Sequence, residues 1–144
     1  MTNNSSPGSD CGNPQEKTIL IASDDEMRRE LLYYIVQKAG FRIEKVDSAR
    51  ETIEKARTIL PDLILLGLNP HASYEALREL QTDEAVNIPI ILLSNHKIDP
   101  STAELLRQEP NVKGLIQLLP DATNLAALLH RLLMTKPPVE SKKE

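Results

Sequence analysis

Short apolar runs alternate with amphipathic segments along most of the chain. Runs such as ILIAS and DLILL have the length and continuous hydrophobicity of strands buried on both faces. Between the runs, apolar side chains recur three and four positions apart, which predicts helices. The predicted strands are Ile19–Ser23, Phe41–Val46, Asp62–Leu66, Ile88–Ser94 and Lys113–Leu118, and the predicted helices are Glu26–Ala39, Ser48–Leu60, Ser73–Asp83, Pro100–Gln108 and Asp121–Met134.

The order of these elements predicts the fold class. Strands that alternate with helices form a parallel sheet, and right-handed crossovers cover both of its faces. Residues at the helix ends agree with this assignment, because Gly40 suits a C-terminal cap and Ser48 with Glu51 forms a capping box. We therefore expect an α/β protein with a doubly wound five-stranded parallel sheet and five helices.

Composition sets the domain limits. The chain has 144 residues, of which 40% are hydrophobic and 26% charged, as expected for one globular domain. Residues 1–16 are rich in Asn, Ser, Pro and Gly, and residues 136–144 are similarly polar, so both are expected to be disordered tails. The domain is expected to span residues 17–135.

Charge and apolar run lengths exclude several kinds of partner. The net charge is −4 and no basic stripe is present, which argues against nucleic acid. No apolar run is long enough to span a membrane, and the start of the chain is unlike a signal peptide. With Cys11 as the single cysteine, a cytoplasmic location is expected. The three histidines lack metal-ligand spacing, His130 is expected on the surface, and no cofactor or metal is expected.

Four segments carry a likeness to a known family: KTILIASDDEMRRELL, PDLILLGLNP, IPIILLSN and the late LLP. Together with the turn at Gly40-Phe41, they resemble the receiver domain of bacterial response regulators, over about Lys17–Met134. The resemblance implies a flavodoxin-like fold with strand order 2-1-3-4-5. It also implies a phosphorelay site, with an acceptor aspartate ending the third strand and an acidic pair holding Mg²⁺ after the first. A Ser or Thr follows the fourth strand, and a Lys precedes a proline after the fifth.

Matched position by position, most of this chemistry is missing. Ser23 falls on the first acid of the pair and Asp24 on the second, although a shift by one residue would make Asp24 and Asp25 the pair. Asp24 is either a remaining Mg²⁺ ligand or an acid favoured at a helix N-terminus. Gly67 stands at the phospho-acceptor position, and glycine has no nucleophile.

The remaining site positions are equally altered. Ser94 matches the hydroxyl residue, whereas Leu119 stands where the family has its lysine, before Pro120. The resemblance implies a cis peptide bond between Leu119 and Pro120. Asp62 lies at the far end of its strand, more than about 10 Å from the site at roughly 3.3 Å per residue, and cannot substitute for the acceptor.

These losses predict a phosphorylation-independent receiver, or pseudo-receiver, that is not an enzyme and acts by binding a protein. The resemblance implies a signalling kinase, an output protein or a second copy as partner, through the first helix or through the face around the fourth and fifth helices. The alternative is a sensor that binds a small ligand in the pocket under Asp24, Gly67 and Ser94. The candidate partner-binding residues are Arg28, Arg29, Tyr33, Tyr34, Glu104, Arg107, Gln117 and Arg131.

Overall fold

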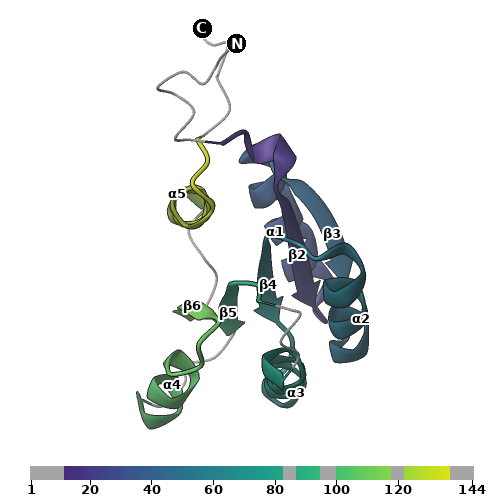
Figure 1. Ribbon diagram of the computed structural model, residues 1–144, viewed down its shortest axis with the longest axis vertical. Helices are drawn as coiled ribbons and strands as arrows, with labels where there is room; N and C mark the ends of the chain where they lie inside the picture. The colour runs from purple at the N-terminus through teal and green to yellow at the C-terminus, as the bar shows by residue number, and fades with distance from the viewer. Residues whose placement is uncertain (1–11, 83–86, 95–99, 118–121, 137–144) are drawn as a thin grey trace, which may run out of the picture.

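The computed structural model contains a five-stranded parallel sheet with the strand order β3-β2-β4-β5-β6 (Figure 1). It describes residues 12–82, 87–94, 100–117 and 122–136. The fold class and the 2-1-3-4-5 order predicted above are confirmed. The strands are β2 (Thr18–Ser23), β3 (Arg42–Val46), β4 (Leu63–Gly67), β5 (Ile90–Ser94) and β6 (Val112–Gln117), and the helices are α1 (Glu26–Lys38), α2 (Ala49–Ile59), α3 (Pro70–Thr82), α4 (Pro100–Arg107) and α5 (Ala122–Leu133).

The sheet separates two aliphatic cores. Helices α1 and α5 cover one face, and α2, α3 and α4 cover the other (Figure 1). Successive side chains of β4 alternate between the two, with Leu63 and Leu65 packed toward α1 and α5, and Ile64 and Leu66 toward the opposite helices. Because all four are fully buried, burial of the central strand on both faces explains its continuous hydrophobic run.

Local capping follows the predicted pattern. The Ser48 hydroxyl accepts the Glu51 N–H at 3.1 Å, and the Glu51 carboxylate accepts the Asp47 N–H at 3.3 Å. Gly40 follows α1 with a φ of 99°, a left-handed conformation that glycine adopts at little cost. The predicted ends of α1 and α2 are therefore correct to within a residue or so.

Two boundaries differ from the prediction by three residues or more. Helix α3 begins at Pro70 instead of Ser73, because the Asn69 side chain accepts the Ala72 N–H at 2.9 Å and proline suits the first helical position. Ordered structure also begins before Lys17. Pro14–Glu16 forms a 3₁₀ helix, and the Gly12 N–H donates to the Met134 carbonyl at 2.7 Å. Residues 12–16 of the expected tail thus pack against the end of the domain.

His130 was expected on the surface, and this expectation is wrong. Its side chain is buried, lies with its ring centroid 5.0 Å from that of Phe41, and has Nδ1 2.8 Å from the Thr135 hydroxyl. The cause is the packing of α5 against the residues that follow α1. Burial lowers the pKa of His130, because the charged imidazolium loses its hydration. None of the helices within the described residues is both long and apolar enough to cross a membrane.

Candidate functional site

The candidate site lies at the carboxyl edge of the sheet, where β2 and β4 end side by side. Ser23 and Gly67, the last residues of the two strands, are partners in the parallel register. Ser23 is fully buried, and its hydroxyl accepts the Asp25 N–H at 3.3 Å and donates to the Asp25 carbonyl at 3.2 Å. The serine therefore closes the turn from β2 into α1, where a carboxylate was expected from the resemblance.

Arg28 occupies the space beside Gly67. Its side chain is only 5% exposed, and its guanidinium Nη2 donates a hydrogen bond to the Gly67 carbonyl. A Cβ atom added at Gly67 would lie 3.1 Å from this nitrogen and 3.3 Å from the Leu93 Cβ. Gly67, which has no side chain, thus faces the long side chain of Arg28, and this side chain fills the space beside the glycine.

This placement corrects the prediction that Arg28 is an exposed partner-binding residue. Position 28 is on the same helical stripe as Leu32 and Ile35, and this stripe faces the sheet. The arginine is therefore carried inward by the phase of α1. The part of the sensor pocket that lies beside Gly67 is filled by the same side chain.

The electrostatics of the site centre on this buried cation. Burial lowers the pKa of Arg28, while the carboxylates of Asp25 and Asp24 act in the opposite direction. A guanidinium remains charged at any physiological pH. The edge therefore carries a fixed positive charge beside two acids.

The two acids each hold a loop in place. Asp25 caps α1, because its Oδ1 accepts the N–H groups of Met27 at 3.0 Å and Arg28 at 3.3 Å. Asp24 reaches across the edge, and its Oδ2 accepts from the backbone N–H and the side-chain amide of Asn69 at 2.9 and 3.3 Å. The role at the helix N-terminus, one of the two alternatives given for Asp24, thus belongs to its neighbour.

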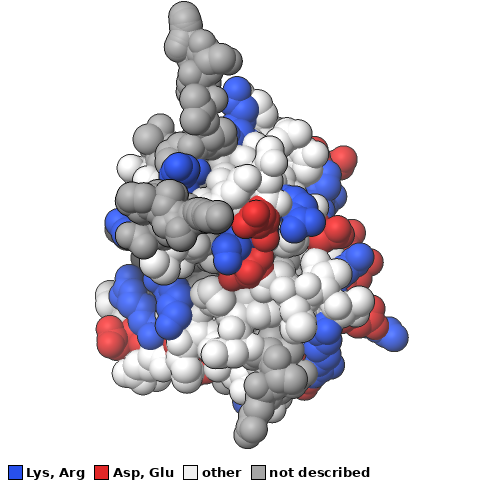
Figure 2. Space-filling view, turned by 45° about the horizontal axis from the view of Figure 1, so that its top comes forward, with Lys and Arg blue, Asp and Glu red and all other residues white. Residues whose placement is uncertain are grey.

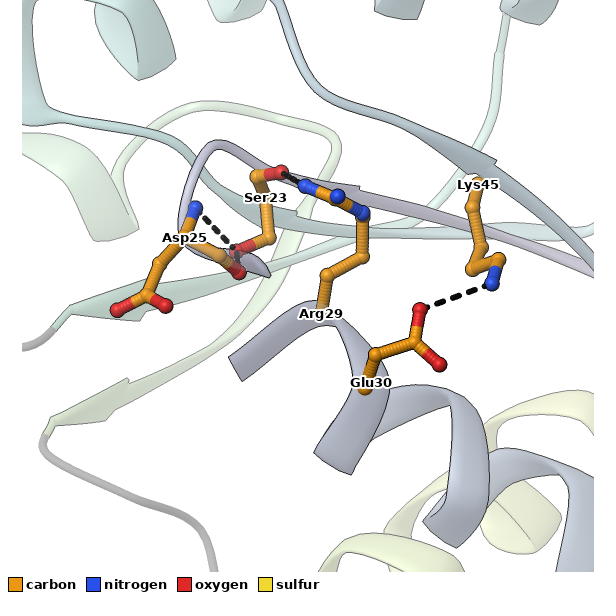
Figure 3. Close-up of polar contacts among 5 residues, drawn as sticks. All are labelled: Ser23, Asp25, Arg29, Glu30 and Lys45. Atoms are coloured by element: carbon orange, nitrogen blue, oxygen red, sulfur yellow. Dashed lines mark hydrogen bonds and ion pairs between the residues drawn. The ribbon is translucent and has the colours of Figure 1, made fainter. Parts of the chain in front are cut away.

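Figure 3 shows polar contacts that Arg29 and Glu30 of α1 make with residues of β2 and β3. Arg29 reaches back from the helix and donates to the Ser23 carbonyl at 2.8 Å. Lys45 pairs with Glu30 at 3.0 Å and lies 4.5 Å from the ring centroid of Tyr33. Arg29 and Tyr33 are therefore half-buried by contacts within the domain, and they are less available to a partner than predicted.

Comparison with known proteins identifies the family. Residues 19–116, about two thirds of the chain, match the family model described as the response regulator receiver domain. The chain belongs to this family. It is 29% identical over 68 residues to the transcriptional regulatory protein CreB of Escherichia coli, and 30% identical over 81 residues to the polar-differentiation response regulator DivK of Brucella ovis. These matches take in 46% and 54% of this chain.

The receiver fold is also found among solved structures. The signal receiver domain of a signal transduction histidine kinase from Syntrophus aciditrophicus is 26% identical, with a TM-score of 0.71 over 89% of this chain and 98% of that one. The curated relatives are matched less completely, over 30% of the length of CreB and 66% of DivK. The chain is therefore a receiver domain of two-component signalling.

The residues of this receiver do not fit the magnesium ion that the family implies. Mg²⁺ requires oxygen ligands in near-octahedral order. Ser23 and Gly67 supply no carboxylate, and the Arg28 guanidinium stands beside Gly67, where it would repel a second cation. Within the described residues, no three His, Cys, Asp or Glu side chains cluster as metal ligands would.

The other predicted positions are placed as follows. Ser94 is the last residue of β5; it is half-buried and in register with Gln117 on β6. Leu119, Pro120 and the side chain of Gln117 lie outside the described residues. Tyr34 is exposed on α1, as predicted. Three more candidates are exposed on α4 and α5, namely Glu104, Arg107 and Arg131.

Sequence reasoning missed Arg28 and Asn69 as parts of the site. A signal for Arg28 was available, because it is spaced four residues from Leu32 and seven from Ile35, within the apolar stripe of the predicted helix. Asn69 gave a weaker signal as the residue before Pro70, where an amide can cap a helix. The contact between Asn69 and Asp24 spans 45 residues and has no local signature.

Proposed function

We propose that this receiver is phosphorylation-independent and acts as a protein–protein interaction module in bacterial two-component signal transduction, without enzymatic activity. One observation carries the proposal: at the acceptor position, a backbone carbonyl accepts a hydrogen bond from the buried Arg28. An acyl phosphate requires a carboxylate at Gly67, and the guanidinium fills the space that such a side chain would use. A signal must then pass through binding alone.

An apolar stripe on α1 is the strongest candidate for the docking surface. Met27, Leu31 and Tyr34 follow one another at helical spacing and are 84%, 38% and 57% exposed. Exposed apolar side chains that form a continuous stripe are typical of helix-mediated recognition. The stripe replaces Arg28, Arg29 and Tyr33 in our prediction of the contact residues, and it keeps Tyr34.

The chemistry of the surface favours a protein as the partner. On the face drawn in Figure 2, basic and acidic side chains are interspersed, and broad uncharged areas lie between them. A nucleic acid would favour a continuous surface of Lys and Arg side chains. A kinase, an output protein or a second copy in the cytoplasm of a bacterial cell is therefore the proposed class of partner.

Phosphorylation is tested by incubation with acetyl phosphate and Mg²⁺, followed by intact-mass measurement. We expect no addition of a phosphoryl group, whereas a receiver with an acceptor aspartate should be modified under the same conditions. Gly67→Asp alone should also remain unmodified, because Arg28 would pair with the new carboxylate and Ser23 supplies no metal ligand. Stoichiometric phosphorylation of the wild-type chain would contradict the proposal.

Docking is tested with two matched surface variants. Met27→Glu with Tyr34→Ser makes the two most exposed residues of the α1 stripe polar, and Leu105→Glu changes an exposed apolar residue on α4. All three positions are solvent-exposed, so stability should change by no more than about 0.5 kcal/mol. We expect a cellular partner retained by the wild-type chain to be lost by the α1 variant and kept by the α4 variant. Equal retention by all three proteins would rule out the α1 surface.

A further inference from the structure

We infer that the guanidinium of Arg28 is the resident cation of the carboxyl edge, standing in for a divalent ion, and that Arg28 sets the ion specificity of this site. The inference rests on the proposed function and goes beyond it. Absence of phosphorylation requires only that an acceptor be missing. Occupation of the site by an internal cation predicts in addition how the edge responds to metal ions.

The geometry supports this role. Arg28 contacts the carbonyl at the end of β4, and the carboxylates of Asp24 and Asp25 are close enough to interact with its charge. A bound metal ion would likewise bring together a backbone oxygen and nearby carboxylates. The guanidinium attracts the same oxygen atoms, and because it belongs to the chain it does not exchange with ions in solution.

Gly67 and Arg28 are complementary in volume as well as in hydrogen bonding. An added Cβ would lie 3.1 Å from Nη2, a close contact at which the guanidinium must move slightly, and 3.4 Å from the central carbon of the guanidinium, an ordinary contact distance. The absence of a side chain at Gly67 therefore makes room for the arginine. Burying a guanidinium is costly, and here the carbonyl and the two acids offset part of that cost.

Three variants separate a resident cation from a side chain that only fills space. Arg28→Met keeps most of the volume and removes the charge, and Arg28→Lys keeps the charge and changes the shape. Arg29→Met removes the same charge one residue away, where the guanidinium contacts the Ser23 carbonyl and does not lie beside Gly67. The melting temperature of the wild-type chain and of each variant is measured with and without millimolar MgCl₂ or MnCl₂, and KCl is used to match the ionic strength.

We expect divalent ions to shift the melting temperature of the wild-type chain, Arg28→Lys and Arg29→Met by less than about 1 °C. Arg28→Met should melt about 5–10 °C lower than the wild type, because a buried hydrogen bond to a charged group is lost. Magnesium or manganese should restore part of this loss, since Asp24 and Asp25 are left without their cation. A side chain that only fills space would lower stability without creating a response to metal ions.

Two results would overturn the inference: an Arg28→Met variant that responds to divalent ions no more than Arg29→Met, or a wild-type chain that responds as strongly as Arg28→Met. If Arg28→Met fails to fold, the wild-type chain supplies the test. Side-chain N–H exchange by NMR should be slow for Arg28 and fast for Arg50, whose side chain is 87% exposed. Equally fast exchange would also contradict the inference, whereas phosphorylation of the wild type is what would contradict the proposed function.

Discussion

The two ends of the strand pair β2 and β4 are held by side chains of opposite charge. At the amino end, the Asp62 carboxylate accepts the Thr18 N–H at 2.8 Å, and the Asp62 N–H donates to the Thr18 carbonyl at 2.8 Å. At the carboxyl end, the Arg28 guanidinium donates to the Gly67 carbonyl. In both places a charged side chain satisfies a backbone group.

The two ends differ in whether α/β folds normally use them to bind ligands. The carboxyl edge of a parallel sheet is where α/β proteins bind ligands, and the amino edge is generally structural. Here the carboxyl edge is closed by Arg28 and by the contact between Asp24 and Asn69. Under the proposed function, the contact of Arg28 with Gly67 joins α1 to the end of β4 where other receivers carry out their chemistry. We call this contact and that of Asp62 with Thr18 the two clamps.

The largest expected effect comes from removing both clamps. Arg28→Ala should lower the free energy of unfolding by about 2–4 kcal/mol, because a charged hydrogen bond and the packing of the side-chain stem are lost. Asp62→Ala should cost about 1–2 kcal/mol by leaving the Thr18 N–H without its carboxylate. The two sites are roughly 16 Å apart along the strand, so the double variant should lose the sum. Urea titration measures all three.

A double variant that loses much less than the sum would contradict two independent clamps. Arg50→Ala provides the matched control for Arg28, since its pair with Glu54 is highly exposed. Its cost should be no more than about 0.5 kcal/mol. A similar cost for both arginine variants would show that Arg28 contributes as little as a surface ion pair.

The sequence was sufficient for the fold and for the location of the site. Continuous apolar runs such as Leu63–Gly67 identify buried strands, and the position of Gly67 follows directly from the run that precedes it. The role of Arg28 could not be read in the same way. Its spacing with Leu32 and Ile35 indicates which of the two adjacent arginines lies on the apolar stripe, but not that its guanidinium contacts the Gly67 carbonyl on another element.

Long-range contacts account for the other differences. Arg28 meets a residue 39 positions away, and Asp24 one 45 positions away. His130 is buried because α5 packs beside Phe41, a contact between opposite ends of the domain. Local periodicity predicts which face of a helix is apolar, but it does not specify a polar residue's partner on another element.

A methyl group at Gly67 tests whether Arg28 fills the space at the carboxyl end of β4. Gly67→Ala places a Cβ 3.1 Å from Arg28 and 3.3 Å from the Leu93 Cβ, so we expect a loss of about 1–2 kcal/mol from overpacking. In an Arg28→Met background the flexible methionine can move aside, and the added cost should fall by at least about 0.5 kcal/mol. A double-mutant cycle measured by denaturant unfolding gives this coupling. Strict additivity would mean that Arg28 does not fill the space beside Gly67.

The pH dependence of stability should distinguish the two ends, because His130 lies against Phe41, which precedes the partner of Thr18 at the amino end of β2. Burial lowers the pKa of His130, so the unfolded chain binds this proton more readily than the folded one. Its contribution is therefore present above about pH 6.5 and is lost as the pH falls below that value. Compared with His130→Leu, the wild type should lose additional stability between pH 7 and 5. Arg28 stays charged throughout, so Arg28→Met should leave this difference unchanged.

The smallest expected effect concerns Asp24. If this residue acts as a hydrogen-bond acceptor for the Asn69 loop, Asp24→Asn should cost only about 0.5 kcal/mol, because an amide oxygen can still accept the Asn69 N–H. Asp24→Ala removes the acceptor and should cost more than Asp24→Asn. Neither variant should change the response of the folded chain to Mg²⁺, since Arg28 already supplies the positive charge at this edge. Thermal melts with and without Mg²⁺ measure both effects, and a magnesium response that disappears in Asp24→Asn would identify Asp24 as a metal ligand. In that case the carboxyl end would still be a binding site, and its likeness to the amino end would not hold.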